Sequence, residues 1–214
     1  MAEPIRVLVI DDHQVIAEGL SLLIASCSDL LVVGLAHSAL DGLRVASDTR
    51  PAVVLLDHHL PDRTGVEIIA ELKETVPDAA IIILTSDDSD DVLVNAFEAG
   101  AAGYLLKTRA ASQVIDAIRD AANGEMLVSE GTLARVLRHQ KARISRDAKV
   151  TTPLTERELE VLRCIAVGLG TRAIADQLGL TVSTIRTYVQ AILRKLDAHS
   201  RLQAVMRAHE RGML

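Results

Sequence analysis

The sequence is poor in aromatic residues and cysteines. Its 214 residues include one phenylalanine, two tyrosines, no tryptophan and two cysteines. Any core must therefore be packed almost entirely from aliphatic side chains. Cys27 and Cys164 lie far apart in the chain, and each fits a reduced core residue better than one half of a disulfide. This cysteine usage favours a reducing compartment.

Long apolar segments are also absent. No run approaches the roughly 18 apolar residues that a membrane-spanning helix requires, and no leader of the secretory type opens the sequence. We therefore expect a soluble cytoplasmic protein. With 214 residues, of which 49% are hydrophobic, the chain is long enough for two modest domains that each bury a core.

Charge is distributed unevenly between the two halves. Residues 1–124 contain 20 acidic and 8 basic residues, for a net charge of −12, whereas residues 125–214 contain 9 and 15, for a net charge of +6. An acidic half joined to a basic half suggests that the second half contacts nucleic acid. Two unrelated solvated surfaces are the alternative that charge alone leaves open.

The first half alternates short apolar runs with helical patterns. The strand-like runs are Ile5 to Ile10, Leu30 to Ala36, Ala52 to Asp57, Ala80 to Leu84 and Gly103 to Leu106. Continuous apolar runs of this length are typical of parallel strands that are buried on both faces. Residues 1–124 are therefore predicted to form an α/β domain with five βα units, doubly wound, with the flavodoxin-like strand order 2-1-3-4-5.

The second half contains helical patterns only. Residues 125–150 are predicted to be a connector, with a short helix over Glu130 to Ala142 followed by a polar, basic linker. Residues 151–214 predict four short helices, and the two that meet at Gly179-Leu180 are typical of a helix-turn-helix. Residues 151–214 are thus predicted to form a small all-α domain.

Polar residues stand where the strands of the first domain end. Asp11 and Asp12 follow the first strand, Asp57 ends the third, Thr85 the fourth and Lys107 the fifth. Ligands of open α/β sheets bind beyond the carboxyl ends of the strands, where the order reverses. Three converging carboxylates repel one another unless a hard cation such as Mg²⁺ holds them. With a lysine and a hydroxyl nearby, this set suits phosphoryl transfer to a carboxylate.

Residues 1–124 resemble the receiver domain of two-component response regulators. The matching segments are Leu8-Val9-Ile10-Asp11-Asp12-His13, Leu55-Leu56-Asp57, Leu60-Pro61-Asp62 with Gly65, Leu84-Thr85-Ser86, and Gly103-Tyr104-Leu105-Leu106-Lys107. The resemblance implies that Asp57 accepts a phosphoryl group from a sensor histidine kinase. It also implies that Mg²⁺ is held by four groups: the carboxylates of Asp11, Asp12 and Asp57 and the backbone carbonyl of His59.

The same resemblance implies roles for three further residues. Thr85 would hydrogen-bond the phosphoryl group, Lys107 would pair with it, and Tyr104 matches the aromatic residue that moves inward with the threonine. Two positions depart from the usual pattern. Thr108 stands where many receivers have a proline, so a cis peptide is not expected there. The second departure is the pair His58-His59, for which two surface loop histidines fit better than a metal site. His59 lies two places after Asp57, where a side chain can influence how long the phosphoryl group persists.

Residues 152–211 resemble the LuxR-type helix-turn-helix of the NarL/FixJ regulators. The matching segments are Leu154-Thr155 with Arg157-Glu158 and Glu160-Val161-Leu162, Ile174-Ala175 with Leu178, Thr184-Ile185-Arg186-Thr187-Tyr188-Val189, and Ile192-Leu193-Arg194-Lys195-Leu196. In such a motif the second helix, here Thr181 to Leu196, enters the major groove. The resemblance implies that bases are read by Arg186, Thr187 and Gln190, and that the DNA backbone is bound by Ser183, Thr184 and Lys195.

The last predicted helix, from Ser200 to Arg211, carries Leu202, Val205 and Met206 on one face. By resemblance this face is a contact between two DNA-bound copies, and burial against its own domain is the alternative. The sequence as a whole predicts a transcription factor that binds an operator as a homodimer when phosphorylated. The alternatives are a regulator that binds DNA without phosphorylation and a phosphatase with an aspartate nucleophile. The phosphatase chemistry needs an acid two residues after the nucleophile, where this chain has His59.

Overall fold

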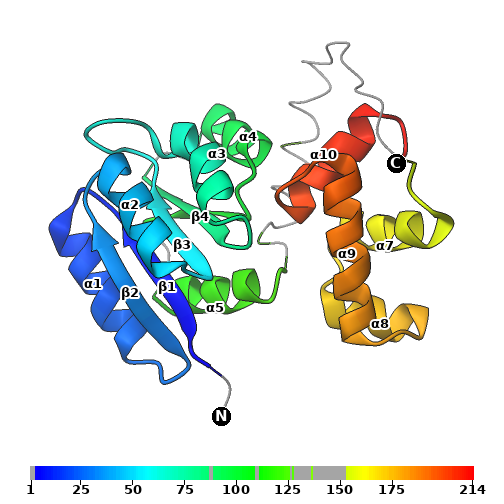
Figure 1. The fold of residues 1–214 in the computed structure, drawn as a ribbon, viewed down its shortest axis with the longest axis horizontal. Helices are drawn as coiled ribbons and strands as arrows, with labels where there is room; N and C mark the ends of the chain where they lie inside the picture. The colour runs from blue at the N-terminus through cyan, green and yellow to red at the C-terminus, as the bar shows by residue number, and fades with distance from the viewer. Residues whose placement is uncertain (1–2, 87–88, 109–110, 126, 128–135, 137–152) are drawn as a thin grey trace.

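The computed structural model describes residues 3–86, 89–108, 111–125, 127, 136 and 153–214. These residues form an α/β part, up to residue 125, and a helical part, from residue 153, that lie side by side (Figure 1). Apart from Val136, the helix expected over Glu130 to Ala142 falls outside the described residues.

The α/β part contains a five-stranded parallel sheet. Its strands are β1 (Ile5–Ile10), β2 (Leu30–Ala36), β3 (Val53–Asp57), β4 (Ala80–Thr85) and β5 (Gly103–Leu106). Their order across the sheet is β2-β1-β3-β4-β5, and every pair is parallel. The predicted flavodoxin-like order is therefore confirmed, and each strand begins and ends within one residue of the predicted position.

Helices cover both faces of this sheet. They are α1 (Gln14–Ala25), α2 (Ala39–Thr49), α3 (Gly65–Thr75), α4 (Asp90–Ala99) and α5 (Ala111–Ala122). Alternate residues of the strands pack with α1 and α5 on one face and with α2, α3 and α4 on the other. Because both faces are covered, all five residues of β3 are buried, which explains why its sequence is continuously apolar up to Asp57.

The helical part contains α7 (Glu156–Ala166), α8 (Thr171–Leu178), α9 (Val182–Leu196) and α10 (Arg201–Glu210). Their apolar residues form a separate core cluster. Three of the four helices begin at a side-chain cap, since Thr155, Thr181 and Ser200 each accept a hydrogen bond from a backbone N–H in the first turn. Thr155 and Glu158 form a capping box, and such caps contribute about 1 kcal/mol each.

One lysine is buried in the α/β part. Lys73, on α3, is 6% exposed, and its Nζ donates a hydrogen bond to the backbone carbonyl of Ala79 at 2.7 Å. Burial lowers the pKa of Lys73 from 10.5 to about 8, although the charge of Asp78 opposes the shift. A charged amine is thus held in a place that favours the neutral form.

Lys73 gives the stability of the protein a defined pH dependence. Between pH 8 and pH 10.5 the unfolded chain binds a proton at this lysine that the folded chain has released, so the free energy of unfolding rises with pH in that window. The rise should be on the order of 3 kcal/mol. In Lys73→Met this rise should disappear. Urea unfolding of both proteins from pH 7 to pH 10 checks it, and parallel pH profiles would contradict the assignment.

Candidate functional site

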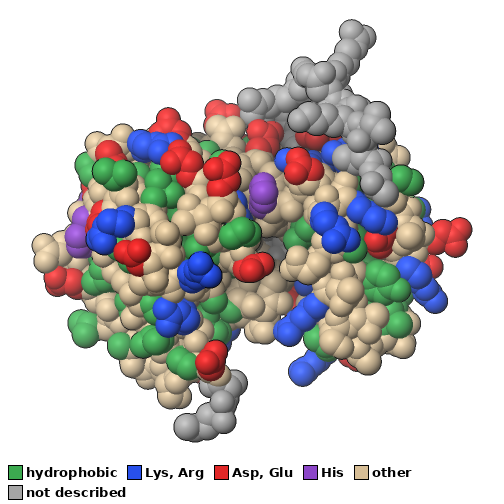
Figure 2. Space-filling model, in the orientation of Figure 1, with side chains coloured by type: hydrophobic (Ala, Val, Ile, Leu, Met, Phe, Trp, Pro, Cys, Tyr) green, Lys and Arg blue, Asp and Glu red, His purple; other side chains and the backbone are tan. Residues whose placement is uncertain are grey.

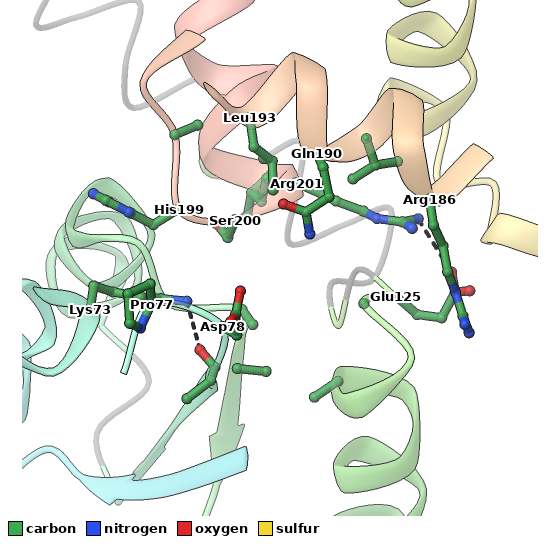
Figure 3. Close-up of a pocket in the computed structure, with 18 of the residues that line it drawn as sticks. Lys73, Pro77, Asp78, Glu125, Arg186, Gln190, Leu193, His199, Ser200 and Arg201 are labelled. Atoms are coloured by element: carbon green, nitrogen blue, oxygen red, sulfur yellow. Dashed lines mark hydrogen bonds and ion pairs between the residues drawn. The ribbon is translucent and has the colours of Figure 1, made fainter. Parts of the chain in front are cut away.

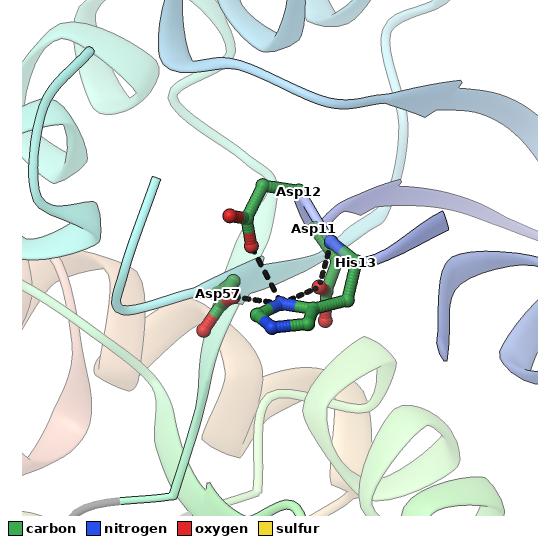
Figure 4. A group of neighbouring side chains, drawn as sticks. All are labelled: Asp11, Asp12, His13 and Asp57. Atoms are coloured by element: carbon green, nitrogen blue, oxygen red, sulfur yellow. Dashed lines mark hydrogen bonds and ion pairs between the residues drawn. The ribbon is translucent and has the colours of Figure 1, made fainter. Parts of the chain in front are cut away.

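Three carboxylates and a histidine meet at the carboxyl ends of β1 and β3 (Figure 4). Strands β1 and β3 are hydrogen-bonded neighbours with Ile10 beside Leu56, so Asp11 and Asp57 follow side by side. Both are buried, whereas Asp12 is exposed at the mouth. The ligand atoms of the group lie within 4.8 Å of one another. The predicted convergence of Asp11, Asp12 and Asp57 is therefore present.

Lys107 provides the positive charge inside this acidic pocket. It follows β5, and its Nζ lies 2.8 Å from Asp11 Oδ2 and 2.8 Å from Asp57 Oδ2. Only the contact with Asp57 has the geometry of a hydrogen bond, and Asp11 Oδ2 accepts none within the described residues. One ammonium therefore serves two buried carboxylates, and a net negative charge remains.

The pKa shifts follow from this imbalance. Burial raises the pKa of Asp57, the charge of Asp11 raises it further, and Lys107 offsets only part of the effect. Burial alone would lower the pKa of Lys107, but its contacts with Asp11 and Asp57 outweigh that effect and raise it. The lysine thus stays charged while Asp57 is held less acidic than an ordinary aspartate.

His13 belongs to the same group, although the sequence reasoning gave it no role. Its Nδ1 lies 2.7 Å from Asp12 Oδ1, 3.4 Å from Asp11 Oδ1 and 3.9 Å from Asp57 Oδ2. The imidazole therefore lies over the carboxylates at the mouth of the pocket, as Figure 4 shows. Its position directly after Asp12 in the sequence could have indicated that its side chain lies beside the carboxylates.

The loop after β3 is held in place from both ends. The Asp62 carboxylate accepts hydrogen bonds from the first two backbone N–H groups of α2, at 2.8 and 3.0 Å, and these bonds lower the pKa of Asp62. At the other end, a Cβ on Gly65 would overlap the carbonyl oxygen of Asp57. Within the loop, the backbone N–H of His59 donates to Asp57 Oδ1 at 3.2 Å, while the His59 side chain is exposed.

Thr85 and Tyr104 lie on the neighbouring strands. Thr85 ends β4, next to β3, and is fully buried. Its carbonyl accepts a hydrogen bond from the Lys107 backbone N–H at 2.8 Å. Tyr104 is half-buried on β5 and packs against the core cluster that contains helix α4.

The residues of the acidic pocket fit a hard divalent cation. They offer carboxylate oxygens, the ligands that Mg²⁺ prefers, and among the described residues none donates a hydrogen bond to the buried Asp11 Oδ2. A divalent cation would also compensate the charge that Lys107 alone leaves unbalanced.

Helix α9 presents most of the predicted DNA-binding residues to its surface. Arg186, Thr187, Gln190 and Ser183 are exposed, and Thr184 is half-buried. Thr181 caps the helix, with its hydroxyl accepting from the Thr184 backbone N–H at 3.1 Å. The opposite face of α9 is buried in the core of the helical part. Lys and Arg side chains are spread over the visible face of this part (Figure 2).

Lys195 is placed differently from the other predicted DNA contacts. Its side chain is 19% exposed, and its Nζ lies 2.7 Å from Glu158 Oε2. Burial raises the pKa of Glu158, but the hydrogen bonds from Lys195 and Thr155 outweigh it and lower the pKa. Lys195 therefore ties α9 to α7, and a phosphate contact would require it to leave Glu158.

Comparison with known proteins assigns both halves of the chain. The response regulator receiver domain family matches residues 7–119, and the luxR family of bacterial regulatory proteins matches residues 152–208. The chain is a response regulator of the NarL/FixJ family. It combines a receiver domain with a LuxR-type DNA-binding domain, and it belongs to the transcription regulators.

Individual relatives match over nearly the whole chain. The response regulator protein VraR of Staphylococcus saprophyticus is 35% identical over 99% of both chains. The transcriptional regulatory protein LiaR of Bacillus subtilis is 36% identical over 98% of this chain and 99% of its own. Among solved structures, the receiver domain of the putative response regulator NarL of Mycobacterium tuberculosis is 28% identical, with a TM-score of 0.56 over 58% of this chain and 100% of its own.

Among the described residues, none of the regulator's helices has the length and apolar character that crossing a bilayer requires.

The face predicted to mediate dimerisation is buried within the regulator. Leu202 and Met206 of α10 belong to the core cluster that contains helix α4 of the receiver, and Val205 belongs to the core of the LuxR-type domain. Gln203 Nε2 donates to the backbone carbonyl of Glu98, at the end of α4, at 2.5 Å. This face of α10 would have to leave α4 before it could contact a second copy.

Helix α9 also faces the receiver. Arg186, Gln190 and Arg194 line a cavity of about 570 Å³ whose opposite wall includes Lys73, Asp78 and Asn123. Arg186 Nη2 contacts Asn123 Oδ1 at 3.4 Å. Figure 3 shows side chains of α9 and α10 on one side of this cavity and receiver side chains on the other. Two of the three predicted base-reading residues therefore face the receiver.

Proposed function

We propose that this response regulator is a phosphorylation-gated transcription factor in which Asp57 is the phosphoacceptor. The observation that carries the proposal is the buried Asp57 carboxylate, which shares the ammonium of Lys107 with Asp11 at 2.8 Å. The donor is a phosphorylated sensor histidine kinase, and the cofactor is Mg²⁺. Asp11, Asp12, Asp57 and the backbone carbonyl of His59 would hold the cation, which supplies positive charge against the phosphoryl oxygens.

The residues of the pocket suit the transfer step. A carboxylate oxygen of Asp57 attacks phosphorus, the P–N bond of the phosphohistidine breaks, and an acyl phosphate forms as the imidazole leaves. Lys107 Nζ, already 2.8 Å from Asp57 Oδ2, neutralises the charge that develops on the phosphoryl oxygens. The Thr85 hydroxyl, on the adjacent strand, would hydrogen-bond the product. Because the phosphoryl group stays on Asp57, the product of the reaction is a phosphorylated regulator and not a released compound.

The contacts between the domains support restraint of DNA binding before phosphorylation. Arg186 and Gln190 line the cavity that faces the receiver, and α10 is packed on α4. In this arrangement duplex DNA and the receiver compete for the same face of α9. Phosphorylation would favour the arrangement in which the two domains separate, which would free α9 for DNA. It would also free Leu202, Val205 and Met206 for contact with a second copy on a two-half-site operator.

DNA binding should depend on a phosphodonor and on Asp57. Treatment of the wild type with a small phosphodonor and Mg²⁺ should tighten binding to DNA sequences selected from a random pool by about tenfold or more. Asp57→Ala should not respond, because it has no carboxylate to phosphorylate. Fluorescence anisotropy measures the affinity, and light scattering reports dimer formation. An equal response in Asp57→Ala, or no response in the wild type, would mean that phosphorylation of Asp57 does not control DNA binding.

His59 is proposed to set the lifetime of the acyl phosphate. Its side chain is exposed, and its backbone N–H donates to Asp57 Oδ1 two residues before it. From that position the imidazole can influence how water reaches the phosphoryl group. His59→Ala should change the half-life of the acyl phosphate by severalfold while leaving the folded structure intact. Phosphate release from ³²P-labelled protein measures it, and identical half-lives would exclude a role for the side chain.

Arg186 is proposed to read bases in the major groove. An arginine that contacts a guanine through two hydrogen bonds contributes about 1–3 kcal/mol of discrimination. Arg186→Ala should therefore lose preference at one base position of the selected sequence while still binding DNA. Ser183→Ala is the matched variant, because loss of a backbone contact should weaken binding to all sequences alike. Selection with each variant distinguishes them, and an unchanged preference in Arg186→Ala would assign the reading to other residues.

A further inference from the structure

Helix α8 differs from its neighbours in the way its N-terminus is capped. Helices α7, α9 and α10 begin at Thr155, Thr181 and Ser200, whose hydroxyls cap them, but α8 begins after Gly170, which has no side chain. Its first backbone N–H, that of Thr171, donates instead to the Glu125 carboxylate, at 2.9 Å to Oε1 and 3.0 Å to Oε2. Glu125 lies 46 positions earlier in the chain, just after the receiver's last helix.

Other groups complete an anion-binding site around this carboxylate. Arg201 Nη1 lies 3.4 Å from Glu125 Oε2, and Arg201 Nη2 donates to the Thr171 hydroxyl at 2.7 Å. A Cβ at Gly170 would lie 2.9 Å from Glu125 Oε2, so a side chain there would require the end of Glu125 to shift. Arg186 is close enough that its charge lowers the pKa of Arg201, after the larger effect of burial. Figure 3 shows Arg186 and Arg201 near Glu125.

One carboxylate does not use all the donors of this site. The Arg201 side chain is 5% exposed, yet its Nε is buried and has no acceptor within the described residues. The Arg201 guanidinium, the Thr171 hydroxyl and a helix N-terminus, with the charge of Arg186 nearby, form a site that suits a group with more oxygens and more charge than a carboxylate. Phosphate groups of DNA are bound by such combinations of arginine and helix N-termini.

We infer that the site formed by Thr171 and Arg201 binds a DNA phosphate, and that Glu125 occupies it as an internal substitute while the domains are closed. The inference rests on the proposed gating and adds to it a contact outside helix α9. In a helix-turn-helix the first helix, here α8, crosses the DNA backbone, so a phosphate can reach its N-terminus. Release of Glu125 and binding of DNA then become one exchange of anions at a single site.

Opposite effects are expected from removing the two partners. Glu125→Gln removes the internal anion and should tighten DNA binding by the untreated full-length protein, by roughly tenfold. Arg201→Gln should weaken DNA binding by the phosphodonor-treated protein and lower the slope of log K against log[salt] by about one, the value for one phosphate contact. Arg201→Lys keeps the positive charge, so most of the slope of log K against log[salt] should remain. A random-sequence duplex suffices, because phosphate contacts do not depend on sequence.

The controls match the charge changes. Asp116→Asn removes an exposed receiver carboxylate and should not tighten DNA binding as Glu125→Gln does. Arg163→Gln removes an exposed arginine of α7 and should not weaken DNA binding as Arg201→Gln does. Thr171→Pro removes the backbone donor together with the hydroxyl that Arg201 contacts. Thr171 is the first residue of α8, where proline is well tolerated, and Gly170 has a ψ of 163°, which suits a residue before proline. This variant should bind the duplex roughly tenfold more weakly.

The possible outcomes distinguish a failure of the phosphate site from a failure of the gating by phosphorylation. If Arg201 only latched the domains together, Arg201→Gln would tighten binding like Glu125→Gln, with an unchanged salt slope, and the phosphate site would be refuted. If Arg201→Gln lost its fold in thermal unfolding, wild-type affinity in a folded Thr171→Pro would refute it equally. If the wild type bound DNA without any response to the phosphodonor, the gating would fail, while the salt slope would still report the phosphate contact.

Discussion

The structure of the receiver depends on one lysine that serves two buried carboxylates. Asp11 and Asp57 end adjacent parallel strands, so the sheet itself forces them together, and Lys107 brings a single ammonium to both. Removing one partner of a buried ion pair typically costs about 3–5 kcal/mol. The charge of the pocket is balanced only in part, and the remaining negative charge suits a divalent cation.

The strands beside this pocket contribute to a core cluster that extends to the LuxR-type domain. Thr85 ends β4 beside Asp57, Tyr104 packs against the cluster of helix α4, and that cluster includes Leu202 and Met206 of α10. A change in the position of Thr85 or Tyr104 on phosphorylation would therefore alter the surface on which α10 rests. Coupling of this kind needs two alternative arrangements of one packed interface, and the proposed gating requires the second arrangement to form where α10 packs on α4.

Local patterns were sufficient to predict most of the secondary structure. Continuous apolar runs correspond to strands because both faces of the sheet are covered, as the burial of every residue from Val53 to Asp57 illustrates. The predicted starts of the last two helices, at Thr181 and Ser200, lie within one residue of the observed starts. The acidic pocket was equally accessible, because parallel strands bring their carboxyl ends to one edge of the sheet.

Contacts between distant segments could not be predicted in this way. No spacing in the sequence indicates that Lys195 pairs with Glu158, or that Glu125 caps a helix 46 positions later, because both pairs form only when separate helices meet. The sequence by itself determined the order of the strands, the residues of the acidic pocket and the type of output domain. Only the tertiary structure decided which anion the N-terminus of α8 holds and which face of α9 is covered, since both depend on how two separately folded cores pack together.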